Sequence, residues 1–182
     1  MKTIKIIAVV SIFFTSAGSA LASTEINLNP SNLNLKSGEV FNLNITVSPQ
    51  NLKNYTVKAE LKYPAQLIEA TGFKLADKWV ALNQPGYNLV DNSKGVLIKT
   101  GGYPKGFNNN LIFGTVTFKA KKTGSGAISV SNDSLVLDIN NKNIYSGGSN
   151  IASLVIESAL IKTVNTSVAL ATEPTQPALK NI

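Results

Sequence analysis

The sequence predicts an all-β fold, a two-sheet sandwich or jelly roll, and three observations carry this prediction. Apolar and polar residues alternate over residues 41–47, and they alternate again over residues 55–63. Further short apolar runs follow, separated at close spacing by Gly, Pro and Asn. Period-two alternation is typical of half-buried strands, and many short strands between turn signals are typical of sandwiches and jelly rolls.

Residues 1–22 differ from the rest of the chain. Lys2 and Lys5 precede an apolar run over residues 6–14, and Ala20-Leu21-Ala22 is a small-x-small site. A membrane anchor would need about 20 apolar residues, but polar and small residues interrupt this run from Thr15 onward. The segment therefore predicts a signal peptide cleaved after Ala22, and an extracellular protein, either secreted or attached to the cell surface.

The two alternating segments are the clearest strands. In residues 41–47 the odd-numbered side chains are apolar and the even-numbered ones are Asn or Thr. In residues 55–63 the odd-numbered side chains should face the core, which leaves the even-numbered ones in solvent. A turn over residues 48–51, which contains Pro49, separates the two. Further strands are expected over residues 67–73, 87–91, 95–100, 112–120, 127–130, 135–139 and 151–157.

The pattern ends near residue 158. Residues 173–177 read Glu-Pro-Thr-Gln-Pro, like the start of a Pro/Thr linker. The expected organisation is a signal peptide at 1–22, one β-sandwich domain at 25–157 and a polar tail or linker at 158–182. Residues 172–182 are expected to be disordered, because they are polar or flanked by Pro and too few to pack.

Composition excludes several classes of function. The chain has no Cys and no His, which rules out disulfides, thiol nucleophiles, thiolate or imidazole metal sites and His-based proton transfer. All 17 basic residues are Lys. Specific reading of nucleic acids favours Arg, so no nucleic-acid partner is expected. The net charge of +7 becomes +5 without Lys2 and Lys5, and we interpret it as favouring solubility.

Catalysis and metal binding are not expected either. Two carboxylates can suffice for glycoside hydrolysis, but the acidic residues are scattered over predicted strand faces and turns. These are Glu60, Glu69, Asp77, Asp91, Asp133, Asp138 and Glu157. Residues 138–141 contain Asp and Asn but lack the acid count and spacing of a calcium loop. The sequence thus predicts a protein that is not an enzyme and has no cofactor.

Several aromatic residues lie in or beside predicted loops. Trp79, Tyr87, Tyr103 and Phe107 could offer planar rings to a sugar. Residues 99–110 are expected to form a polar loop, which is either a plain connector, the interpretation that we favour, or a loop of the kind that often carries binding function. Alternatively, Trp79 plugs one end of the sandwich, because a single large indole more often serves the core. Both interpretations remain open from the sequence.

The order of the segments resembles the cohesin family, over about residues 25–157. No single motif is specific, and the order of the motifs carries the resemblance. One departure is that the Asp usually found between Tyr and Pro is missing at Tyr63-Pro64, which we interpret as a one-residue deletion that keeps Tyr63 facing inward. The matching segments are residues 33–41 (LNLKSGEVF), 61–64 (LKYP) with Leu67 and Glu69, 113–121 (FGTVTFKAK), 128–132 (ISVSN) and 135–138 (LVLD).

The resemblance implies a nine-stranded jelly roll that binds a dockerin-like protein domain through one sheet face. The resemblance implies no metal site in this chain, because in a cohesin–dockerin complex the calcium belongs to the dockerin. The face would be built from Thr56, Lys58, Glu60, Lys62, Asn88 with Val90 or their neighbours, Leu97 and Lys99.

Two alternatives stay open beside this reading. One is a carbohydrate-binding module that holds polysaccharide through Trp79, Tyr87 and Tyr103. The other is a structural subunit of a surface layer or appendage. Contact with a membrane is expected only through export or through an anchor not seen in this chain.

Overall fold

The computed structural model describes residues 23–147 and 150–159. The predicted signal peptide at 1–22 and the expected disorder of residues 172–182 lie outside the described residues. The described part contains twelve β-strands and no α-helix. Among these residues there is accordingly no helix of the length and hydropathy needed to cross a membrane.

Four antiparallel strands form the smaller sheet. Its order is β1 (Glu25–Asn29), β3 (Val40–Ser48), β9 (Leu111–Ala120) and β5 (Ile68–Leu75). The alternation predicted for residues 41–47 is confirmed, because all four apolar side chains of this segment are at most 8% exposed. This sheet covers one side of the core.

Eight strands form the larger sheet. Its main path is β2 (Asn32–Lys36), β12 (Ile151–Glu157), β10 (Gly124–Val130), β4 (Asn54–Lys62), β8 (Val96–Phe107) and β6 (Val80–Leu82). Two short strands complete it, because β11 (Leu135–Leu137) pairs with β4 and β7 (Asn88–Asp91) pairs with β8. Among the strand pairs of the described residues, only β2 and β12 run parallel.

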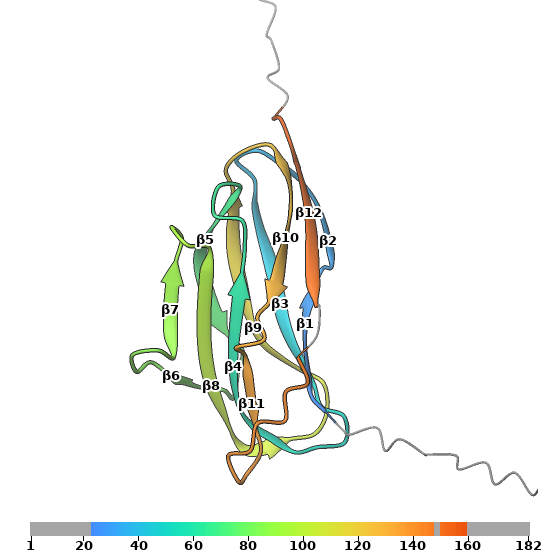
Figure 1. Cartoon of the computed structure of the whole chain (residues 1–182), viewed down its shortest axis with the longest axis vertical. Helices are drawn as coiled ribbons and strands as arrows, with labels where there is room; N and C mark the ends of the chain where they lie inside the picture. The colour runs from blue at the N-terminus through green and yellow to red at the C-terminus, as the bar shows by residue number, and fades with distance from the viewer. Residues whose placement is uncertain (1–22, 148–149, 160–182) are drawn as a thin grey trace, which may run out of the picture.

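The first five strands alternate between the two sheets, β6, β7 and β8 then follow one another in the larger sheet, and after β9 so do β10, β11 and β12 (Figure 1). Three of the twelve described strands, β6, β7 and β11, are only three or four residues long. The nine strands expected from the alternation and the apolar runs correspond to β3, β4, β5 and β7 to β12, and β1, β2 and β6 are additional. The prediction of an all-β two-sheet sandwich is confirmed.

The opening of the chain forms two strands rather than one. β1 lies in the smaller sheet and β2 in the larger one. The Asn29–Pro30 peptide bond between them is cis. The chain crosses from one sheet to the other between β1 and β2, so residues 25–36 contribute an edge strand to each sheet.

The predicted loop at residues 99–110 is wrong over most of its length, because β8 continues as a strand to Phe107. Gly101 and Gly102 pair with Val57 and Thr56 on β4. A Cβ atom at Gly101 would lie 3.1 Å from the Phe113 ring. Glycine is therefore favoured here by close packing within a strand, and it does not mark a turn.

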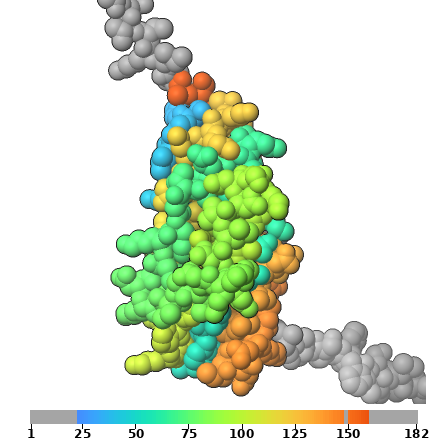
Figure 2. All heavy atoms as spheres, turned by 90° about the vertical axis from the view of Figure 1, so that its left-hand side faces the viewer, coloured from blue at the N-terminus to red at the C-terminus, as the bar shows by residue number. Residues whose placement is uncertain are grey.

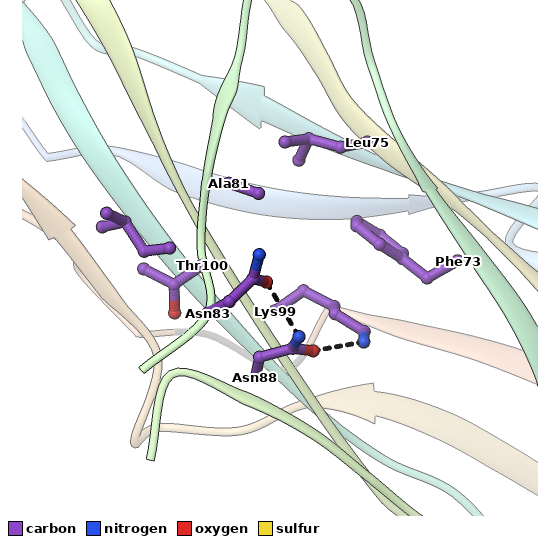
Figure 3. A pocket seen from close by; sticks show the side chains of 8 residues that line it. Phe73, Leu75, Ala81, Asn83, Asn88, Lys99 and Thr100 are labelled. Atoms are coloured by element: carbon purple, nitrogen blue, oxygen red, sulfur yellow. Dashed lines mark hydrogen bonds between the residues drawn. The ribbon is translucent and has the colours of Figure 1, made fainter. Parts of the chain in front are cut away.

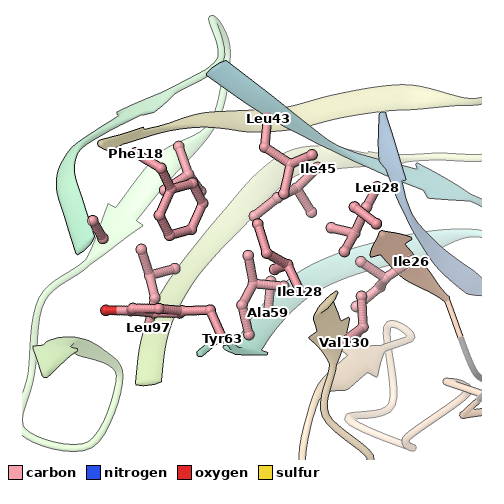
Figure 4. Close-up of a cluster of buried hydrophobic side chains, with 14 of the residues drawn as sticks. Ile26, Leu28, Leu43, Ile45, Ala59, Tyr63, Leu97, Phe118, Ile128 and Val130 are labelled. Atoms are coloured by element: carbon pink, nitrogen blue, oxygen red, sulfur yellow. The ribbon is translucent and has the colours of Figure 1, made fainter. Parts of the chain in front are cut away.

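The core lies between the two sheets and is almost entirely apolar (Figure 4). Tyr63 faces inward, as predicted, and is 6% exposed. Its ring packs edge-on against Phe118 at 5.2 Å, and its hydroxyl donates to Asn92 Oδ1 at 2.7 Å. The polar tip of a buried tyrosine is thus satisfied, as burial requires. The largest fully buried side chains include Phe113, Phe118, Ile26, Leu43, Ile45, Leu61, Ile68 and Leu97.

The described chain enters and leaves the sandwich at opposite ends. In Figure 1, β1 begins near the lower end and β12 finishes at the upper end. Figure 2 turns the left-hand side of that view toward the reader, where the region from β5 to β8, in greens, covers much of the visible surface. The outer faces of the two sheets form the long sides of the domain, and the ends of the described chain lie at its two tips.

Candidate functional site

The outer face of the larger sheet carries the polar row predicted on β4. Val57, Ala59 and Leu61 are fully buried, so the intervening side chains point away from the core. The structure thus places Thr56, Lys58, Glu60 and Lys62 on this outer face. Of these four, only Lys62 is exposed, with 56% of its side chain in solvent.

Glu60 is the centre of a charged network on this face. Its carboxylate oxygens lie 3.9 Å from Lys58 Nζ and 3.9 Å from Lys62 Nζ, and Lys62 Nζ also lies 3.9 Å from Asp133 Oδ2. Glu60 is only 8% exposed. Its backbone N–H donates to Ser134 Oγ at 3.0 Å. Glu60 therefore lies between the two lysines and offers little surface of its own to a partner.

The assignment of Leu97 to this face is wrong, because Leu97 is fully buried. The β4–β8 register pairs Leu61 with Leu97 and Glu60 with Ile98. Paired residues of antiparallel strands share a face. Ile98 and Val96 are therefore the outward residues of β8, beside Glu60 and Lys62.

Asn88 and Lys99 are not on the outer face either. They pair with each other across β7 and β8, on the side where Leu97 points. Lys99 Nζ donates to Asn88 Oδ1 and lies 5.6 Å from the centre of the Phe73 ring (Figure 3). Partial burial lowers the pKa of Lys99. The predicted set is thus divided among the outer face, the core and a cavity beside β5.

Leu89 lies on the outer face, although the sequence prediction named its two neighbours, Asn88 and Val90, and not Leu89 itself. It pairs with Ile98, which pairs with Glu60, so these three side chains form one row across β7, β8 and β4. Leu89 is 43% exposed. Residues 96–98 are apolar at three consecutive positions, so alternation could not show which of them face outward. Once Ile98 is known to face outward, its pairing with Leu89 places Leu89 on the outer face as well.

Trp79 does not present its ring at the surface. It is 8% exposed and its Nε1–H donates to the Ile112 carbonyl at 3.0 Å. Its ring makes edge contacts with Tyr103, Phe107 and Phe113, with centroids 4.9 to 5.2 Å apart. The core interpretation of Trp79 is therefore correct, and its assignment as a sugar platform is wrong.

The other two aromatic candidates do not form a platform with it. Tyr103 is half-buried and its ring is inclined by 70° to that of Trp79. Tyr87 is 44% exposed at the turn before β7. Stacking on a sugar needs rings that are exposed and roughly coplanar, and this trio does not meet that requirement.

The acidic candidates that make side-chain hydrogen bonds in turns have structural roles. Asp91 accepts from the Ser93 hydroxyl at 2.6 Å, which lowers the pKa of Asp91, and from the backbone N–H groups of Ser93 and Lys94. Asp138 accepts from the N–H groups of Asn140 and Lys142. Across residues 23–147 and 150–159, no cluster of three acidic side chains is arranged to hold a metal ion.

Comparison with known proteins identifies the fold. No family model matches the sequence, and no curated protein matches it. Solved structures do match. A Clostridium thermocellum complex of the OlpC cohesin with Doc435 matches with a TM-score of 0.60 at 14% identity, covering 79% of this chain and 99% of that one.

Two further structures agree with it. The cohesin CaCohA2 from Clostridium acetobutylicum has a TM-score of 0.56 at 14% identity, over 74% of this chain and 91% of that one. A non-cellulosomal cohesin from the archaeon Archaeoglobus fulgidus has a TM-score of 0.57 at 17% identity, over 75% and 93%. The chain therefore has the fold of cohesin domains, as the order of its sequence motifs predicted.

Proposed function

We propose that this chain is a non-catalytic binding module that holds a helical, dockerin-type protein domain on the outer face of its larger sheet. Two kinds of support favour this. The fold is that of cohesins, and the matching OlpC cohesin was solved in complex with a dockerin, Doc435. The outer face also has the composition of a protein interface, which the next paragraphs develop.

The observation that carries the proposal is the row Leu89–Ile98–Glu60 across β7, β8 and β4. Leu89 is an exposed large apolar residue, and Ile98 beside it is partly exposed. Lys62 and Asp133 form a charged border next to this row. An apolar centre with a polar rim is the usual anatomy of an interface, and the apolar stripe of a helix fits such a flat surface.

The sharpest test is an apolar-to-acidic substitution at the centre of this face. Leu89→Asp should weaken binding to dockerin domains of the source organism, measured by calorimetry, by about tenfold to a hundredfold. That range follows from the roughly 1.5–3 kcal/mol that burial of a leucine contributes. Val40→Asp is the matched control, because Val40 is 59% exposed on β3 of the other sheet. It should leave the affinity unchanged.

Two results would contradict the proposal. One is that the unmodified chain binds none of these dockerin domains. The other is that Leu89→Asp and Val40→Asp reduce binding equally, which would point to a different face. Lys62→Glu provides a second readout, because a charge at the rim should mainly change the association rate and its dependence on salt.

Reversing the charge of Lys58 or Glu60 is less informative. The two side chains pair with each other, and Glu60 is only 8% exposed, with its backbone hydrogen-bonded to Ser131 and Ser134. A substitution there would disturb the sheet as well as the surface. Substitutions at Lys62 and Leu89 change the surface with less effect on packing, because both side chains are exposed.

We also infer that the module works outside the cell, either secreted or held at the cell surface. The support is the segment from Lys2 to Ala22 and the place where the folded part begins. Thr24 is fully buried, and its N–H donates to the Ile144 carbonyl at 2.8 Å. Cleavage after Ala22 would therefore leave one residue before the first buried position and remove nothing from the described sandwich.

A further inference from the structure

A small cavity lies between β5 and the edge formed by β6, β7 and β8. Its volume is about 210 Å³. Phe73, Leu75 and Ala81 provide apolar surface, and Asn83, Asn88 and Lys99 provide polar atoms (Figure 3). Asn83 and Asn88 are exposed, so the cavity opens to solvent past these two residues.

The polar atoms form a chain with a defined direction. Lys99 Nζ donates to Asn88 Oδ1, and Asn88 Nδ2 donates to Asn83 Oδ1 at 2.9 Å. Both amide oxygens therefore already accept one hydrogen bond. The donors left over include the remaining protons of the Lys99 ammonium and the amide group of Asn83. In Figure 3 the Asn83 amide nitrogen points away from Asn88, toward Ala81.

The charge of Lys99 is not balanced by a described acidic group. Five ion pairs occur within the described residues, and none involves Lys99. Its ammonium lies over the Phe73 ring instead, and burial lowers the pKa of Lys99. A partly desolvated cation that lacks a counter-ion favours an anion with acceptor atoms.

We infer that this cavity binds a small monocarboxylate with an apolar body. The carboxylate would accept from Lys99 and Asn83, and the body would pack on Phe73 and Leu75. The volume supports this size, since an apolar protein cavity of about 150 Å³ accommodates benzene. A single negative charge matches the single cation.

The inference goes beyond the proposed function and does not depend on it. Lys99 points to the opposite side of β8 from Ile98 and the outer face. The carboxylate could belong to a free organic acid or to the C-terminus of a peptide. These sources share the recognising chemistry, and the experiment separates them.

The test uses fluorine NMR with 4-fluorobenzoate as the probe and the full chain as the receptor. We expect a saturable shift for 4-fluorobenzoate and none for the neutral 4-fluorobenzyl alcohol. Lys99→Met should weaken binding by about tenfold or more, because it removes a charge-assisted hydrogen bond while keeping an unbranched side chain only one atom shorter. Lys74→Met is the matched control on β5, an exposed lysine that does not line this cavity. It should bind like the unmodified chain.

A second variant tests the cavity without changing charge. Ala81→Leu should fill part of the space and also weaken binding, with Lys99 intact. Equal binding of the acid and the alcohol would overturn the inference, and so would equal loss in Lys99→Met and Lys74→Met, or no saturable binding at all. Gly-Gly-Phe with a free C-terminus, compared with its C-terminal amide in competition with 4-fluorobenzoate, distinguishes the sources. Displacement by the free peptide alone identifies a peptide terminus, and no displacement by either identifies a free acid.

Discussion

Replacing Trp79 by alanine tests whether this side chain serves the core or a ligand. The substitution removes three edge contacts, to Tyr103, Phe107 and Phe113, and the hydrogen bond to the Ile112 carbonyl. Truncating a buried Trp or Phe to Ala costs about 3–5 kcal/mol of unfolding free energy. Small domains have a total of about 5–15 kcal/mol. Trp79→Ala should therefore lose a large part of the stability of the domain.

Trp79→Phe separates packing from hydrogen bonding. It keeps an aromatic ring but leaves the Ile112 carbonyl without the indole donor. We expect a loss of about 1–3 kcal/mol, because the carbonyl loses its donor and the smaller ring leaves part of the site unfilled. Urea denaturation followed by circular dichroism measures both variants. For the unmodified chain, fluorescence reports on the same site, because Trp79 is the single tryptophan.

A ligand role for Trp79 predicts a different result. In that case Trp79→Ala would abolish polysaccharide pull-down while changing the unfolding free energy by less than about 1 kcal/mol. That outcome would refute the burial argument. A large loss of stability, with no polysaccharide bound by the unmodified chain, would support it.

Three further predictions follow from the backbone, the buried tyrosines and the N-terminal segment. Gly95→Ala should cost about 3 kcal/mol or more in chemical denaturation, because Gly95 has φ of +66° and its Cβ would lie 2.0 Å from the Tyr63 carbonyl oxygen. Gly38→Ala, at φ +88° in open space, should cost about 1 kcal/mol, and equal costs would contradict the steric argument. Burial raises the pKa of Tyr63 and of Tyr145 above the ordinary value near 10. The folded state thus keeps protons that the unfolded state releases, and the unfolding free energy should fall as pH rises above about 10. Substituting both tyrosines by Phe should flatten this decline, and an unchanged slope would show that other groups cause it. Intact-mass measurement of exported protein should find Ser23 as the first residue, and material that retains Met1 or Ser11 would contradict cleavage.

The sequence alone determined the sandwich and the direction of its clearest strands. Residues 41–47 and 55–63 alternate without interruption, and their inward and outward positions follow that alternation, although Tyr55 is only half-buried and the outward Glu60 is largely buried. This succeeds because alternation is a local consequence of the strand backbone. The order of short motifs also predicted the cohesin fold, although the solved cohesins reported above share only 14–17% identity with this chain.

Contacts between distant residues decided the rest. Val96, Leu97 and Ile98 are all apolar, and only pairing with β4 shows that Leu97 faces inward. The sequence of Gly101 and Gly102 indicates a loop, but in the structure both residues pair with β4 and β6 as part of a strand. Trp79 becomes a core residue because strands far away in sequence bring Phe107 and Phe113 to its ring.

Lys99 shows most clearly what tertiary structure adds. As a lysine on a predicted strand it was expected to face outward, but its long side chain reaches past Phe73 to Asn88 from an inward position. A strand near the sheet edge permits this, because the side chain can bury its methylene groups and still bring the ammonium to a polar partner. Residue type and period therefore determine where strands form, whereas the covering of each face by the other sheet determines which side chains remain free to bind.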